Sequence, residues 1–193
     1  MDTLIAKSIS KLYFKLTGWK TVGAIPSSVK KCIIVGAPHT SNWDFIYARI
    51  ALYIYGYKIR YLIKDSVLKN PIASWFFRVT GAIPVNRSKS NNLTGELAEL
   101  LKNEDMLYLA IPPEGTRKRV KRWKTGFYRV AIDCNIPIAL AFLDYKNKQA
   151  GFMKIFYPTG NMIEDFKVIE SFYSPEMAAN PDYYNPQIIE KDD

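Results

Sequence analysis

The chain has 193 residues, which is enough for one domain with a sizeable hydrophobic core. Hydrophobic residues make up 48% and charged residues 23%, which excludes a disordered chain and predicts a globular protein. The net charge of +9 predicts an anionic partner, such as a nucleic acid, an anionic membrane surface or a phosphorylated substrate. The chain shows no signal peptide and no apolar run of the roughly 18 residues that a membrane-spanning helix needs, so we expect a protein that can lie on a membrane without crossing it.

The pattern of residues 3–17 predicts an amphipathic N-terminal helix. We treat residues 1–18 as a segment separate from the main domain. Apolar residues recur at helical spacing from Ile5 to Leu16, and Lys7, Lys11 and Lys15 form a stripe. A helix with a lysine face suits an anionic membrane interface. The same pattern is also typical of an ordinary surface helix that docks on the core.

The rest of the chain alternates between expected strands and helices. The strands are expected at residues 20–25, 31–37, 58–63, 82–85, 106–111, 136–145 and 151–157. The helices are expected at residues 43–55, 71–80, 91–103 and 125–134, followed by a helix or irregular cover at 162–172. This alternation predicts a single α/β domain, residues 19–173, with a largely parallel central sheet flanked by helices and an antiparallel last strand. The acidic segment 174–193 contains three prolines and is expected to be extended or poorly ordered.

His39 is the only histidine of the chain and lies between an expected strand and an expected helix. Its imidazole can exchange a proton near neutral pH, and Asp44 is near enough in such a turn to orient the ring. The alternative is a turn in which Asp44 caps the helix and His39 merely packs. No G-x-S-x-G nucleophile motif is present. We therefore expect His39 to deprotonate the hydroxyl of a bound acceptor, which then attacks an activated acyl group.

Further polar clusters follow three other expected strands, at Lys64, at Asn86 and Arg87, and at residues 113–117. Because the carboxyl ends of parallel strands meet at one edge of a sheet, these clusters should lie near His39. Cationic side chains can bind phosphate, although each cluster alone is also typical of a solvated turn. The basic run at 117–124 suits a phosphate-bearing substrate, an anionic surface, a nucleic acid or a solvated loop. No nucleotide phosphate loop is present, which disfavours ATP or NAD chemistry.

Together these clusters resemble the motifs of the glycerophospholipid acyltransferase family, whose best-known members acylate lysophosphatidic acid. The resemblance covers roughly residues 30–145. His39 and Asp44 match the family's His-x-x-x-x-Asp motif, and residues 81–87 match its arginine-bearing second motif. Residues 113–117 match the Pro-Glu-Gly-Thr-Arg motif in full, and residues 136–138 match an apolar, proline-bearing fourth motif.

The resemblance implies that residues 19–173 form an acyltransferase domain in which His39 is the general base and Asp44 its partner. It also implies a set of substrate-binding residues, with cations around the acceptor phosphate and others shaping the site: Lys64, Arg87, Glu114, Gly115, Thr116 and Arg117. The donor is expected to be acyl-CoA or acyl-carrier protein, as a co-substrate, with no cofactor. Two cysteines and one histidine lack the spacing of a metal site, so we expect no metal. The family's N-terminal membrane anchor favours the interfacial interpretation of the first helix.

The expected activity is O-acylation of lysophosphatidic acid to phosphatidic acid by a peripheral protein on the cytoplasmic face of a membrane. Two departures from the family pattern concern the acceptor: Ala139 and Leu140 stand where a second proline is usual, and Pro112 replaces a common aromatic residue. Another lysolipid, for example an amino-acid-containing one, therefore stays open as the acceptor. A hypothesis from a different class is a non-catalytic module that binds anionic lipid or nucleic acid, although we expect no nucleic acid as a partner.

Overall fold

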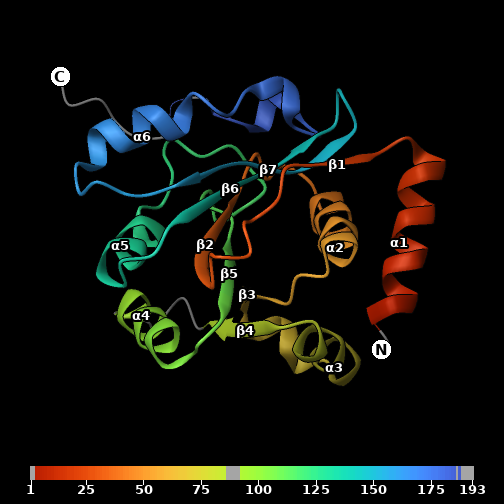
Figure 1. The fold of residues 1–193 in the computed structure, drawn as a ribbon, viewed down its shortest axis with the longest axis horizontal. Helices are drawn as coiled ribbons and strands as arrows, with labels where there is room; N and C mark the ends of the chain where they lie inside the picture. The colour runs from red at the N-terminus through yellow and green to blue at the C-terminus, as the bar shows by residue number, and fades with distance from the viewer. Residues whose placement is uncertain (1–2, 86–91, 186, 188–193) are drawn as a thin grey trace.

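Seven strands form one sheet in the order β1-β7-β6-β2-β5-β3-β4 (Figure 1). The computed structural model describes residues 3–85, 92–185 and 187. The strands are β1 (Lys20–Val22), β2 (Lys31–Gly36), β3 (Ile59–Lys64), β4 (Ala82–Val85), β5 (Leu107–Ile111), β6 (Ile138–Asp144) and β7 (Gln149–Phe156). Strands β6, β2, β5, β3 and β4 are parallel, whereas β7 is antiparallel to β6 and β1 pairs with β7. The expected single α/β domain with a largely parallel sheet is therefore confirmed.

The helices cover both faces of this sheet. They are α1 (Thr3–Thr17), α2 (Trp43–Tyr55), α3 (Pro71–Val79), α4 (Leu93–Asn103), α5 (Gly126–Asp133) and α6 (Met162–Glu170), with short 3-10 turns η1 (Asp65–Lys69), η2 (Pro175–Met177) and η3 (Pro181–Tyr183). Figure 1 shows α4, α5 and α6 on one side of the sheet and α1, α2 and α3 on the other. Such two-sided cover is what a parallel sheet requires, because both of its faces are apolar.

The central strand β2 shows how the sequence produces these two faces. Its residues Cys32 to Val35 are all buried, and successive side chains of a strand point to opposite faces. Ile33 and Val35 join the core under α4, α5 and α6, whereas Cys32 and Ile34 join the core on the α2 side. A continuous apolar run therefore serves both layers and places its carboxyl end, where His39 follows, between them.

Helix α1 is present where the sequence predicted it, and it docks on α2 through aromatic side chains. Trp19 stacks on Tyr47 of α2 with ring centroids 4.2 Å apart, and Phe14 packs beside both rings. The other face of α1 leaves large apolar side chains exposed, at Leu4 and Leu16 among others. None of the helices in the described part of the chain combines the length and the apolar character needed to cross a bilayer.

The prediction for the C-terminal segment was wrong over its described part. Residues 174–185, here called the C-terminal strap, pack against the domain instead of being extended or poorly ordered. Tyr184 is only 1% exposed, and Ala178 is buried in the same core as α5 and α6. Burial of these apolar side chains stabilises the segment against the domain, although its prolines and acidic residues had indicated an extended or poorly ordered tail. Residue 186 and residues 188–193 lie outside the described part.

Several boundaries also differ from the expected ones. Strand β1 has three residues rather than six, and its pairing with β7 was not predicted. Lys64 is the last residue of β3 rather than the first residue beyond it, and the turn η1 then leads into α3. Helix α3 begins at Pro71, where the Asn70 side chain accepts hydrogen bonds from two backbone N–H groups, as expected for an N-cap.

A substitution at Gly81, which joins α3 to β4, tests how tightly the backbone is packed at this connection. Gly81 has φ +96°, and a Cβ there would lie 2.2 Å from the Ile59 carbonyl oxygen. Gly56, which ends α2, also has a positive φ of 77°, but it faces open space. We expect Gly56→Ala to cost about 1 kcal/mol of unfolding free energy and Gly81→Ala about 3 kcal/mol or more, because only the second adds a backbone clash to the strain. Chemical denaturation measures both, and equal losses would contradict the prediction.

Candidate active site

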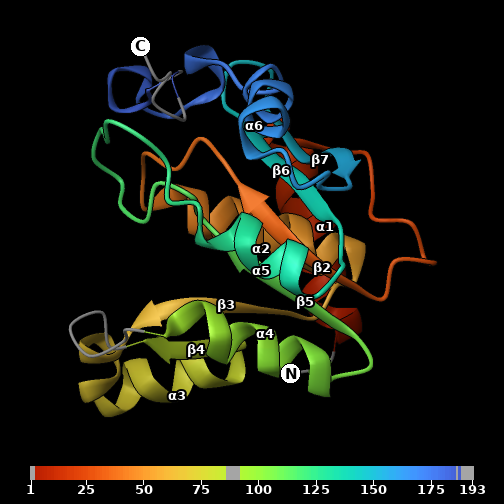
Figure 2. The same ribbon diagram turned by 90° about the vertical axis from the view of Figure 1, so that its left-hand side faces the viewer.

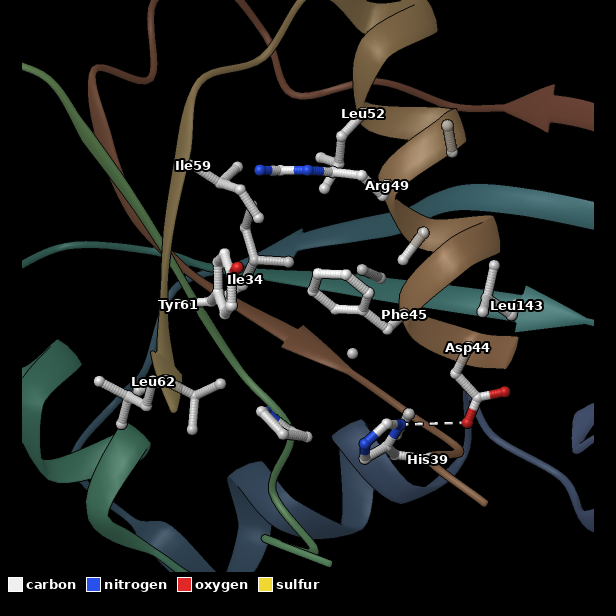
Figure 3. Close-up of a pocket in the computed structure, with 18 of the residues that line it drawn as sticks. Ile34, His39, Asp44, Phe45, Arg49, Leu52, Ile59, Tyr61, Leu62 and Leu143 are labelled. Atoms are coloured by element: carbon white, nitrogen blue, oxygen red, sulfur yellow. Dashed lines mark hydrogen bonds and ion pairs between the residues drawn. The ribbon is translucent and has the colours of Figure 1, made fainter. Parts of the chain in front are cut away.

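A cavity of about 720 Å³ lies between α2 and the sheet, a size typical of small-molecule sites. Most of its wall is apolar, including Phe45 and Leu52 of α2 and Ile34 of β2. Figure 3 shows His39 and Asp44 at one end of the cavity, and Arg49, Leu52 and Ile59 at the other. The end beside His39 is the open one, because it is lined by side chains that are exposed to solvent: Lys64, Thr116 and Arg117.

His39 and Asp44 are in direct contact across the turn that joins β2 to α2. The Nδ1 atom of His39 lies 3.0 Å from Oδ2 of Asp44 (Figure 3). An ionised carboxylate can only accept a hydrogen bond, so Nδ1 is the donor in this contact, and in the neutral form of the ring the lone pair is then on Nε2. The His39 side chain is 22% exposed, whereas that of Asp44 is 6% exposed. The pair thus combines an accessible base with a buried carboxylate that orients it.

The Asp44 carboxylate accepts four hydrogen bonds from residues that the structure describes. Besides His39, the backbone N–H groups of Thr40 and Ser41 donate to Oδ2, at 2.8 and 2.9 Å. The Tyr145 hydroxyl, at the end of β6, donates to Oδ1 at 2.8 Å. A buried charge is tolerated when hydrogen bonds replace its water, and these four donors complement the ionised form of the carboxylate. Burial, with a smaller contribution from Asp44, raises the pKa of Tyr145, so its hydroxyl stays a donor near neutral pH.

Glu114 supports the His39 turn from the opposite side. Its Oε1 atom accepts a hydrogen bond of 3.0 Å from the His39 backbone N–H, and the side chain is buried. Its Oε2 atom is buried without a partner among the described residues. Burial raises the pKa of Glu114 from 4.5 to about 7, because a charged carboxylate loses its hydration there. Glu114 therefore holds the backbone of the general-base candidate rather than lining the cavity.

The structure brings most of the predicted site residues to one edge of the sheet. Besides His39 and Asp44, the cavity is lined by Lys64, Gly115, Thr116 and Arg117. They come from the carboxyl ends of β2, β3 and β5, as the parallel topology requires. Arg87 lies outside the described residues.

The C-terminal strap holds the same turn. The Asn180 backbone N–H donates to the Thr40 hydroxyl at 3.1 Å, and the Asn180 side chain donates to the Thr40 carbonyl at 3.0 Å. The Met177 carbonyl accepts a hydrogen bond from the Tyr145 backbone N–H at 3.0 Å. The strap therefore positions both Thr40, between His39 and Asp44, and Tyr145, which contacts Asp44.

These residues lie within a known sequence family. The model of the acyltransferase family matches residues 20–140, well over half of the chain. The chain belongs to the acyltransferase family. This match confirms the family that the sequence motifs indicated.

The fold of this acyltransferase is similar to that of a solved enzyme. The crystal structure of 1-acyl-sn-glycerophosphate (LPA) acyltransferase, PlsC, from Thermotoga maritima matches with a TM-score of 0.63, over 88% of this chain and 76% of that chain. The sequence identity is 18%, so the likeness concerns the fold. No curated protein sequence matches the chain significantly.

Sequence reasoning missed three residues of the candidate site. Tyr145 and Asn180 carried no signal, since each lies more than 100 residues from the partner that it contacts. Arg49 did carry a sequence signal, because it is the only charged residue between Phe45 and Tyr55. Its guanidinium lies over the rings of Tyr53 and Tyr61, donates to the Thr80 carbonyl and has no carboxylate partner among the described residues. A cation thus lies at the end of the cavity away from His39, beside the apolar side chains of Leu52 and Ile59.

The raised pKa of Glu114 predicts how stability depends on pH. Between about pH 4.5 and 7 the native state keeps a proton that the unfolded state releases, so the free energy of unfolding falls as pH rises. The loss from this carboxyl is about 3 kcal/mol. Glu114→Gln copies the protonated form and should abolish this decline, whereas Glu99→Gln, at an exposed site on α4, should keep it. Urea titrations across this pH range measure both, and a decline in Glu114→Gln as large as that of the unaltered protein would refute the assignment.

Proposed function

We propose that this acyltransferase moves a fatty acyl group from acyl-CoA or acyl-carrier protein to the free hydroxyl of lysophosphatidic acid, which yields phosphatidic acid. The observation that carries the proposal is the position of the His39–Asp44 pair at the open end of an apolar cavity. A hydroxyl held in front of His39 meets a base, while the hydrocarbon chain attached to a substrate has an apolar space beside it.

The chemistry follows from the orientation of the imidazole. His39 Nε2 takes the proton of the acceptor hydroxyl while the hydroxyl oxygen attacks the thioester carbonyl carbon. Collapse of the tetrahedral adduct then breaks the carbon–sulfur bond, and the leaving thiolate takes the proton from the imidazolium. Asp44 holds the ring and stabilises its transient positive charge, as in other His–Asp pairs. The acceptor supplies the nucleophile, which agrees with the absence of a G-x-S-x-G motif.

The cavity supports an acyl chain as its occupant. Its lining includes residues of α2 and of five strands of the sheet, and apolar side chains dominate it beyond His39. Burying a methylene group there is favourable by about 0.8 kcal/mol. The Arg49 guanidinium at the inner end opposes deeper penetration, because an alkyl chain cannot replace the hydration of that charge.

The open end supports a phosphate-bearing acceptor. Lys64 and Arg117 are exposed cations that line the cavity beside His39, and the basic run at 117–124 follows directly. Arginine can bind a phosphate through two parallel hydrogen bonds, and lysine acts as a point charge. Arg87 and Thr116 belong to the same proposed acceptor site.

Peripheral binding to an anionic membrane, at its cytoplasmic face, is part of the proposal. Helix α1 exposes Leu4, Ile9 and Leu16, which are between 62% and 77% accessible. Its three lysines alternate with these apolar positions along the helix. Apolar side chains with neighbouring lysines are typical of helices that lie in a membrane interface.

Removal of the base tests the chemistry. His39→Ala should lower acyl transfer to lysophosphatidic acid by about 10²–10⁴-fold, the usual contribution of a general base. Asp44→Asn should also lower it strongly, while Asp133→Asn, at an exposed position on α5, should leave it unchanged. Product formation from acyl-CoA or acyl-carrier protein is measured by mass spectrometry, with circular dichroism as a check on folding. Full activity in folded His39→Ala would exclude this mechanism.

The acceptor is tested by the response of Arg117 to substrates with and without phosphate. Arg117→Ala should lower kcat/KM for lysophosphatidic acid about tenfold or more relative to a monoacylglycerol, because a charge-assisted hydrogen bond is lost only with the first substrate. Arg129→Ala, on the exposed face of α5, is the matched control and should leave this ratio unchanged. An unaffected ratio in Arg117→Ala, or preference for an amino-acid-containing lysolipid in the same screen, would overturn the proposed acceptor.

A further inference from the structure

Helix α3 presents an apolar stripe to solvent. Ile72, Trp75, Phe76 and Val79 follow the i, i+3, i+4, i+7 spacing of one helix face, and they are 79%, 67%, 42% and 63% exposed. In a helix of a water-soluble domain such a stripe packs on the core. No residue of α3 is buried, and the helix is held mainly through Phe77, whose ring lies 6.1 Å from that of Phe45. The apolar stripe of α3 therefore has no partner within the described chain.

The stripe lies next to the open end of the cavity. Val67, in the turn η1 that precedes α3, lines the cavity and is also 38% exposed. Lys64, at the end of β3, also lines the cavity and directly precedes η1. Figures 1 and 2 place α3 at the same end of the molecule as the N-terminal end of α1, where Leu4 and Ile5 are exposed. Two separate apolar surfaces thus share one end of the protein.

Cations surround this surface. Residues 58–80 contain five lysine or arginine residues and a single acidic residue, Asp65. Lys64, Lys69 and Arg78 are exposed around α3. Anionic lipid headgroups complement such cations, while the apolar side chains can enter the acyl region below the headgroups.

We propose that the exposed face of α3, together with η1, docks into an anionic phospholipid bilayer as a second contact beside α1. In this orientation the open end of the cavity faces the membrane surface, so a lipid chain can pass between bilayer and cavity without crossing bulk water. That consequence for catalysis rests on the proposed function, whereas the docking itself does not.

A second copy of the chain fits the same surface less well. A two-fold contact would bring two identical basic surfaces together, each with Lys64, Lys69 and Arg78, and like charges repel. A nine-residue helix is about 14 Å long, which is short for the roughly 800 Å² per partner of a stable interface. The charge and the size of the patch both favour a bilayer.

Vesicle binding of the full chain tests the proposal. Ile72→Ser combined with Trp75→Ser should lower the partition coefficient about tenfold or more on vesicles of phosphatidylglycerol and phosphatidylcholine, since two large apolar side chains leave the interface. The matched control replaces Ile163 and Val168 of α6, which are 49% and 46% exposed, by serine, and it should bind like the unaltered protein. Equal losses in the two variants, or undiminished binding of the α3 variant, would refute the docking. Equally strong binding to pure phosphatidylcholine would also refute it.

A fluorescence measurement tests the position of α3 without altering the stripe. In the Trp43→Phe variant Trp75 is the only exposed tryptophan, because Trp19 and Trp123 are 6% and 3% exposed. Lipids that carry bromine on their acyl chains should then quench the Trp75 emission by about half on binding. Unquenched emission from vesicle-bound protein would overturn the proposal. So would a lipid-free dimer, seen by analytical ultracentrifugation, that the Trp75→Ser substitution dissociates.

Activity assays separate this proposal from the proposed function. With lysophosphatidic acid embedded in vesicles, the α3 variant should lose acyl transfer about in proportion to its binding. With a short-chain acceptor that stays monomeric in water, its rate should match that of the unaltered protein. If the protein acylates neither acceptor while the vesicle results hold, the proposed function fails and the docking stands. Equal rates of the α3 variant and the unaltered protein on vesicle-embedded acceptor would overturn the docking as a catalytic requirement.

Discussion

The buried carboxylate of Asp44 is the interaction on which the rest of the site depends. A charge with so little exposure is stable only when hydrogen bonds replace its water, and the chain supplies four of them. To do so, the turn after β2 must wrap around the carboxylate and β6 must end beside it. The hydrogen bonds that stabilise the buried Asp44 carboxylate therefore also fix the orientation of the His39 ring.

Helix α2 connects this carboxylate to the apolar cavity. Its first turn carries Asp44, while Phe45, Arg49 and Leu52 of the same helix line the cavity. The distance between Asp44 and this part of the apolar lining is therefore set by a single helix, whereas Lys64 ends β3 and Arg117 follows β5. The carboxylate that orients His39 thus belongs to the same helix as part of the apolar lining, while the exposed cations of the cavity come from other segments of the chain.

The sequence predicted those features that depend on neighbouring residues. Alternating apolar runs and turns identified the sheet and its helices, and a spacing of five residues predicted the contact between His39 and Asp44. Contacts between distant segments had no such signal. The hydrogen bond from Tyr145 to Asp44 joins residues 101 positions apart. Strand β1 has only three residues, too few to show the alternation of apolar and polar side chains by which a strand is recognised, so its pairing was not predicted. The prediction for the strap was wrong because its prolines and charged residues indicated a loose tail, whereas a few buried side chains, Tyr184 among them, fix it to the domain.

The contact between Thr40 and Asn180 also has a consequence for biosynthesis. These residues are 140 positions apart, so the ribosome must have added 140 residues after Thr40 before Asn180 can contact the turn after β2. The strands that carry the turn can pair earlier, since β2 and β5 are both in the first 111 residues. A nascent chain that has not yet reached Asn180 therefore has the turn with His39 and Asp44 but lacks the two hydrogen bonds that Asn180 makes to Thr40.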